Sequence, residues 1–180
     1  PYTFQGIGKT CLEDTFKLAG DHGIKIIALE VLHARHIDEI RNANEKAGSP
    51  TGIMLQVGTR NAQNFELLKA LGQQKEYPIL YKRGFGISLE ESLTGAEYIA
   101  KEGNQNIVFC LRGMKSLFAT PYRNFVDFAY IPALKRLTRL PICIDPSHAI
   151  GHLSEDPNHI PDLFHANAQG IIAGANMLLL

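Results

Sequence analysis

Basic side chains occur at or just after the carboxyl ends of three short apolar segments: Arg60, Lys82 and Arg112. In a parallel α/β protein these ends meet at one edge of the sheet, which is where active sites lie. Cations that converge there require an anion, and a phosphate, alone or with a carboxylate, is the simplest one. A single cation at a strand end is often only a solvated charge. Three at successive strands predict an anion-binding site.

Uncharged and acidic polar residues fall at the same positions. Glu30 ends the first apolar segment, and Gln56 and Thr59 end the second. Gly58 beside them lets the backbone approach a ligand closely. We expect Asn61 to cap the following helix, which would bring the free amides of that helix near the anion.

His148 follows the fifth apolar segment, three residues after Asp145. It can act as a general acid or base, as a metal ligand or as a capped core histidine. Asp145 could orient its ring or share a metal with it. We expect other histidines to be surface or loop residues: His33, His36, His152, His159 and His165.

The elements that must position these residues alternate between strands and helices. Near-continuous apolar runs, typical of strands buried on both faces, occur at 24–31, 53–57, 78–82, 106–111 and 141–145, with a sixth beginning at Met177. Helical patterns occupy about 9–20, 34–47, 62–73, 88–102, 124–138 and 159–173. Ser88 and Glu91 form a capping box at the start of one of them.

This alternation predicts an α/β fold with a parallel sheet, as either an open doubly wound sheet or most of a (β/α)8 barrel. Because a complete barrel takes about 250 residues, length alone favours the open sheet. We expect one domain over residues 1–180, with no interior linker.

Composition excludes several classes of protein. Of the 180 residues, 45% are hydrophobic and the formal net charge is +0, which argues against a general nucleic-acid binder and against docking on an acidic membrane. No apolar run approaches the roughly 20 residues of a membrane span, and the first residues do not form a signal peptide. The three cysteines, Cys11, Cys110 and Cys143, lack the spacing of a disulfide framework or a zinc site. We therefore expect reduced thiols and a cytoplasmic protein.

Several motifs together resemble those of a known family. They are Pro1 to Gly6, Gly58-Thr-Arg-Asn-Ala-Gln-Asn-Phe-Glu-Leu-Leu-Lys69, Tyr81-Lys-Arg-Gly84, Gly95-Ala-Glu-Tyr-Ile99, Cys110-Leu-Arg-Gly113 and Asp145-Pro-Ser-His-Ala149. In this order and spacing they are similar to DAHP synthase, the 3-deoxy-D-arabino-heptulosonate 7-phosphate synthase family. The compact type I branch, near 3-deoxy-octulosonate 8-phosphate synthase, is the most similar. The resemblance reverses the preference for an open sheet, because it implies a (β/α)8 TIM barrel with about six βα units in this chain.

The resemblance also implies an activity, the metal-dependent condensation of phosphoenolpyruvate with erythrose 4-phosphate, which is the first step of the shikimate pathway. By position, Arg60, Lys82 and Arg112 would hold phosphoenolpyruvate, helped by Thr59 and Gln56. Glu30 would lie near the reacting carbon. The remaining implications are a metal-ligand role for His148, a divalent metal such as Mn²⁺, Fe²⁺ or Zn²⁺, and a homo-oligomer (dimer or tetramer).

The chain departs from the family pattern in ways that leave alternatives open. The family's metal-binding Cys and its Lys-Pro-Arg-Thr motif would precede Pro1, and its last Glu and Asp ligands would follow Leu180. We therefore expect a fragment of a longer protein, the alternative being a short relative that has lost activity. Leu111 stands where the family usually has Glu. Two other functions remain: a non-catalytic phosphoenolpyruvate-binding protein, and a Schiff-base aldolase that uses Lys82 as its nucleophile.

Overall fold

The computed structural model describes residues 8–152 and 154–179. The segment Pro1–Gly6 and residue Leu180, which entered the resemblance, lie outside these ranges. The strands are β1 (Ile26–Val31), β2 (Gly52–Val57), β3 (Ile79–Lys82), β4 (Ile107–Leu111), β5 (Ile142–Ile144) and β6 (Met177–Leu178). The helices are α1 (Leu12–Asp21), α2 (Arg35–Lys46), α3 (Phe65–Gln73), α4 (Leu89–Lys101), α5 (Ile131–Leu137), α6 (Pro146–Ile150) and α7 (Asp162–Ala173). Short 3₁₀ helices are η1 (Gly8–Cys11), η2 (Thr59–Asn61) and η3 (Phe128–Tyr130).

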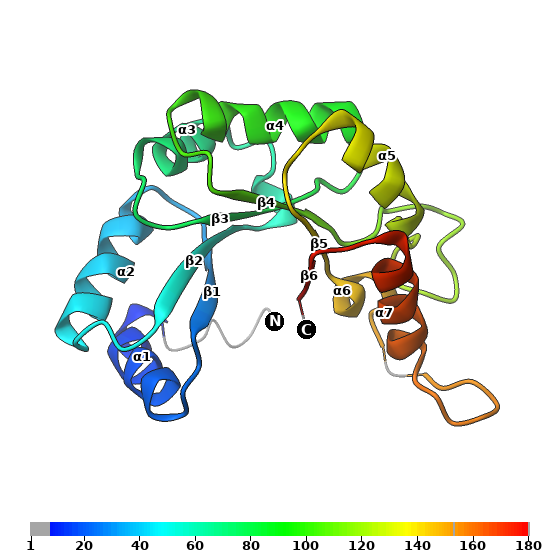
Figure 1. Ribbon diagram of the computed structural model, residues 1–180, viewed down its shortest axis with the longest axis horizontal. Helices are drawn as coiled ribbons and strands as arrows, with labels where there is room; N and C mark the ends of the chain where they lie inside the picture. Colours follow the sequence, from blue (N-terminus) through cyan, green and yellow to red (C-terminus); the bar gives the residue numbers. More distant parts are fainter. Residues whose placement is uncertain (1–7, 153, 180) are drawn as a thin grey trace.

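The strands form a single parallel sheet in the order β1-β2-β3-β4-β5-β6. A doubly wound sheet would reverse its strand order at a switch point, whereas here each strand pairs with the next one along the chain. Figure 1 shows the sheet curled into an arc, with α2, α3, α4 and α5 along its convex side. This arrangement is part of a TIM barrel, so the fold class implied by the resemblance is confirmed.

The two faces of the sheet follow from the period of two along each strand. Residues that point outward pack against the helices and form the main core, among them Leu55, Val57, Ile79, Tyr81, Phe109 and Leu111. The alternate positions form a smaller apolar cluster on the inner face, made of Met54, Leu80, Cys110 and Cys143. In β1 to β5 a polar residue at or next to the carboxyl end continues this inward-facing set: Glu30, Gln56, Lys82, Arg112 and Asp145.

Most element boundaries agree with the sequence prediction, but the segment 124–138 does not. It is helical only from η3 and α5 onward, because a loop anchored by the Met114–Phe125 bridge occupies the preceding residues. The short helix α6 was not predicted as a separate element. The Ser88–Glu91 capping box of α4 is present.

The predicted cap of α3 is wrong. Asn61 lies in η2, and the side chain of Asn64 accepts the hydrogen bond from the Leu67 amide instead. In the part of the chain that the structure describes, no helix is both long and apolar enough to cross a membrane.

Candidate active site

The carboxyl ends of the strands bring the predicted polar residues to one edge of the sheet. Lys82 is the last residue of β3, Arg112 follows β4 and Asp145 follows β5. All three occupy alternate positions relative to the outward-facing core residues, so they project from the inner face. The site is thus built on adjacent, hydrogen-bonded strands, which fix the spacing of its cations.

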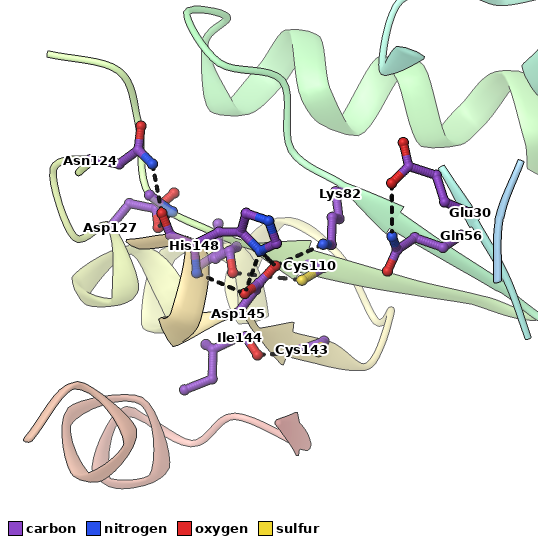
Figure 2. Close-up of polar contacts among 12 residues, drawn as sticks. Glu30, Gln56, Lys82, Cys110, Asn124, Asp127, Cys143, Ile144, Asp145 and His148 are labelled. Carbon is purple, nitrogen blue, oxygen red and sulfur yellow. Dashed lines mark hydrogen bonds and ion pairs between the residues drawn. The ribbon is translucent and has the colours of Figure 1, made fainter. Parts of the chain in front are cut away.

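A hollow of about 70 Å³ lies at this edge. It is lined by Glu30, Gly58, Thr59, Arg60, Lys82, Phe85, Arg112, Arg123 and His148. Every side chain predicted for the site lies there except Gln56, whose Nε2 donates to Glu30 Oε2 at 3.3 Å (Figure 2). Gln56 therefore supports Glu30 from the next strand.

Arg112 is the cation whose environment is most unusual. Arg112 is only 3% exposed, and its Nε and Nη1 atoms have no hydrogen-bond partner among the described residues. Burial lowers the pKa of Arg112; the charge of Asp145 opposes this effect, and the nearby charge of Arg123 adds to it. Buried donors without partners are costly, so this guanidinium is set up for an acceptor that the protein itself does not supply.

Asp145 joins two of the predicted residues (Figure 2). Its Oδ2 lies 2.7 Å from Lys82 Nζ and 2.8 Å from His148 Nδ1. Its Oδ1 accepts from the His148 amide at 3.1 Å, as the N-cap of α6. This carboxylate fixes both the lysine and the imidazole, and turns His148 Nε2 away from itself.

The glycine at position 58 leaves room for Glu30. A Cβ at Gly58 would overlap the Glu30 carboxylate. Glu30 itself is exposed, at the end of the edge strand β1. Its position therefore depends on Gly58 and on the hydrogen bond from Gln56.

Arg83 follows Lys82 directly but belongs to the outer layer. Its Nη1 lies 3.0 Å from Asp127 Oδ2, and Asp127 Oδ1 accepts from the Gly113 amide at 2.8 Å. Burial raises the pKa of Asp127. This pair ties the loop after β3 to the loop after β4, so Arg83 supports the site without lining the hollow.

Phe85 and Arg123 line the hollow but were missed by the sequence prediction. Arg123 directly precedes the segment 124–138, whose first residues form a loop and not the expected helix. Its amide donates to the Ile150 carbonyl at 2.8 Å, and Asn124 Nδ2 donates to the His148 carbonyl at 2.6 Å, which ties this loop to α6. No local pattern predicts this contact, because it joins segments more than 20 residues apart.

The other predicted histidines and the strand cysteines do not line the hollow. His33, His152, His159 and His165 are exposed, whereas His36 is half-buried and its Nδ1 accepts from the Leu32 amide at 3.3 Å. Cys110 and Cys143 are fully buried neighbours on the inner face, as expected for core thiols. Burial, helped by the adjacent Cys143, raises the pKa of Cys110. Residues 8–152 and 154–179 contain no group of three or more His, Cys, Asp or Glu placed to hold a metal ion.

Comparison with known proteins identifies relatives of this arrangement. A model of the DAHP synthetase I family matches residues 1–178. A curated protein of Thermotoga maritima, phospho-2-dehydro-3-deoxyheptonate aldolase, is 38% identical over 151 residues, which cover 84% of this chain and 41% of that protein.

Two solved structures from the same organism have the same fold. A truncated form of 3-deoxy-D-arabino-heptulosonate 7-phosphate synthase matches with a TM-score of 0.69 and 28% identity, over 97% of this chain and 70% of that one. A phospho-2-dehydro-3-deoxyheptonate aldolase (DAHP synthase) matches with a TM-score of 0.71 and 28% identity, over 97% of this chain and 56% of that one. The chain spans less than half the length of the curated relative that it matches. The sequence motifs, the partial barrel and these matches together show that the chain belongs to the DAHP synthetase I family.

Proposed function

We propose that this chain forms the phosphoenolpyruvate-binding part of a DAHP synthase, which condenses phosphoenolpyruvate with erythrose 4-phosphate and releases phosphate. The observation that carries the proposal is Arg112, a buried guanidinium with two unpartnered nitrogens beside a hollow that Arg60 and Lys82 also line. An anion that accepts from these donors would remove the cost of burying them without partners. The name of the curated relative is consistent with this activity.

The charges at the site suit a substrate that carries a phosphate and a carboxylate. Arg60 and Arg112 would hold the phosphate with the Thr59 amide, and Lys82 would reach both anionic groups. Lys82 already has Asp145 as a partner, so its free protons point elsewhere. Multiple fixed cations hold the substrate in attack geometry and compensate its charge as phosphate leaves.

Glu30 and His148 would act at the reacting atoms. Glu30 lines the same hollow, where a carboxylate can orient the water that adds to the carbon bearing the phosphate. His148, held through Nδ1 by Asp145, offers Nε2 as a ligand, a common arrangement for metal-binding histidines. A divalent metal bound there would polarise the aldehyde oxygen of the acceptor sugar. The described residues supply one such ligand, so the others would come from elsewhere in the protein.

The Schiff-base alternative is less consistent with the geometry. That mechanism needs a neutral lysine amine as nucleophile. Lys82 Nζ instead lies 2.7 Å from the buried Asp145 carboxylate, which is a partner for an ammonium group. Borohydride treatment with a carbonyl substrate would test this directly, and we expect no trapped adduct.

Exposed apolar surface and free cysteines bear on assembly and location. Large apolar side chains are exposed near both edges of the sheet, including Ile24 and Ile26 at one and Phe164, Ile171 and Ile172 at the other. Such surfaces require covering, which further units of the barrel or a second copy in a homo-oligomer would supply. The three free cysteines agree with a reducing, cytoplasmic location.

Calorimetric titration of phosphoenolpyruvate, with and without Mn²⁺, tests the function. We expect Arg112→Ala to weaken binding by a few kcal/mol, because it removes a buried charge partner of the ligand. Arg139→Ala is the matched control, since Arg139 precedes β5 and so lies at the opposite end of the sheet. Equal affinity in wild type and Arg112→Ala would contradict the proposal. In the complete protein, binding of phosphoenolpyruvate without turnover of erythrose 4-phosphate would favour the non-catalytic alternative.

A further inference from the structure

The aromatic ring of Phe85 contacts two of the cations that line the hollow. The Arg112 Cζ atom lies 4.6 Å from the ring centroid, and the Arg60 Cζ atom lies 5.9 Å from it. Both distances are within the range of attraction between a guanidinium and an aromatic face. One side chain thus contacts both arginines, which come from different strand ends.

Phe85 lies outside the main core, in the loop after β3. It is half-buried and lines both the hollow and a larger cavity of about 570 Å³. Its carbonyl accepts a hydrogen bond from the Lys115 amide at 3.1 Å, which anchors the loop after β3 to the loop after β4. Because Phe85 borders two open spaces and its ring contacts Arg112, loss of the ring would leave the Arg112 guanidinium with room to move.

The neighbouring Arg83 shows another way to stabilise a buried cation. Arg83 is paired with Asp127 and also lies 5.2 Å from the Tyr130 ring. Among the described residues, no carboxylate forms an ion pair with Arg60 or Arg112. A carboxylate partner there would occupy the donors that an anionic ligand needs. An aromatic ring attracts the cations through its face and leaves their N–H groups free.

We propose that Phe85 is a positioning residue of the anion site, which holds Arg60 and Arg112 in binding geometry in place of an acidic partner. The inference rests on the proposed function, because it assigns a role within the same site. It adds a residue that acts through the two arginines without contacting the reacting atoms.

The test compares Phe85→Leu with Phe85→Tyr in the full chain, with inorganic phosphate and phosphoenolpyruvate as the calorimetric ligands. Leucine keeps an apolar side chain but has no aromatic ring, whereas tyrosine keeps the aromatic ring. We expect Phe85→Leu to weaken binding of both ligands roughly tenfold and Phe85→Tyr to remain within about twofold of wild type. Phe118→Leu is the matched control, since Phe118 lines the larger cavity but not the hollow, and its ring stacks on neither arginine.

Steady-state kinetics separate positioning from a general loss of structure. In the complete protein, we expect Phe85→Leu to raise the KM for phosphoenolpyruvate more than it lowers kcat, and the ligand-free variant to unfold in one cooperative transition, as wild type does. Wild-type affinity in Phe85→Leu, or an equal loss in the leucine and tyrosine variants, would overturn the inference. If wild-type protein binds neither ligand, the proposed function itself fails, a result distinct from either of these.

Discussion

Replacement of Arg112 by methionine should separate stability from binding. Methionine has a similar length and no donors, so Arg112→Met removes the two unpartnered nitrogens, Nε and Nη1, from a residue that is 3% exposed. Unsatisfied buried donors cost about 1–3 kcal/mol. Their removal should therefore stabilise the ligand-free protein. Loss of the attraction between the guanidinium and the Phe85 ring offsets part of this stabilisation, although a methionine sulfur also packs well on an aromatic ring.

The expected result is a ligand-free protein that is more stable than wild type by about 1–2 kcal/mol. For a chain of this length this corresponds to a rise in melting temperature of about 2–8 °C. Binding should change in the opposite direction, with a loss of about 2–5 kcal/mol for phosphoenolpyruvate.

Urea unfolding with and without phosphoenolpyruvate measures both effects in one assay. Wild-type protein at a ligand concentration of about 100 Kd should gain about 2.7 kcal/mol of stability, whereas the variant at the same concentration should gain about 0.9 kcal/mol or less. Arg139→Met serves as the control, because it lies outside the hollow and should keep the wild-type ligand response. A variant that is less stable than wild type without ligand, or that still responds fully to phosphoenolpyruvate, would refute the reasoning.

Three further changes follow from individual contacts. Gly58→Ala places a Cβ against the Glu30 carboxylate, so we expect kcat to fall while phosphate affinity measured by calorimetry stays within about twofold of wild type; unchanged turnover would remove Glu30 from its proposed role. Asn64→Ala should lower the free energy of unfolding by about 1 kcal/mol and Asn61→Ala by less, since only Asn64 caps α3; equal losses in urea titrations would contradict this assignment. Burial raises the pKa of Tyr81, so the unfolded chain ionises first and stability should fall as pH rises above about 10; Tyr81→Phe should make this decline shallower in alkaline unfolding curves, and an unaltered slope would show that Tyr81 does not cause it.

The fold could be predicted mainly because its strands are continuous apolar runs. The segments around Leu55, Leu80 and Phe109 are buried from both sides, and such runs differ clearly from the helical patterns between them. The helix prediction for 124–138 failed at 124–127, where the Met114–Phe125 bridge and the contact of Asn124 with the His148 carbonyl override the local helical pattern. The prediction also named Asn61 as the cap of α3, whereas the cap is Asn64. Both residue types can cap a helix, and only the geometry after β2 selects between them.

The sequence by itself determined which residues end the strands, and therefore that Arg60, Lys82, Arg112 and His148 approach one edge of the sheet. This information is local, because strand direction and the period of two are properties of short segments. The tertiary structure decided which cations have partners: Asp145 pairs with Lys82, Asp127 with Arg83, and Phe85 contacts Arg112. Those choices depend on the curl of the sheet and the packing of distant loops, which no short segment encodes.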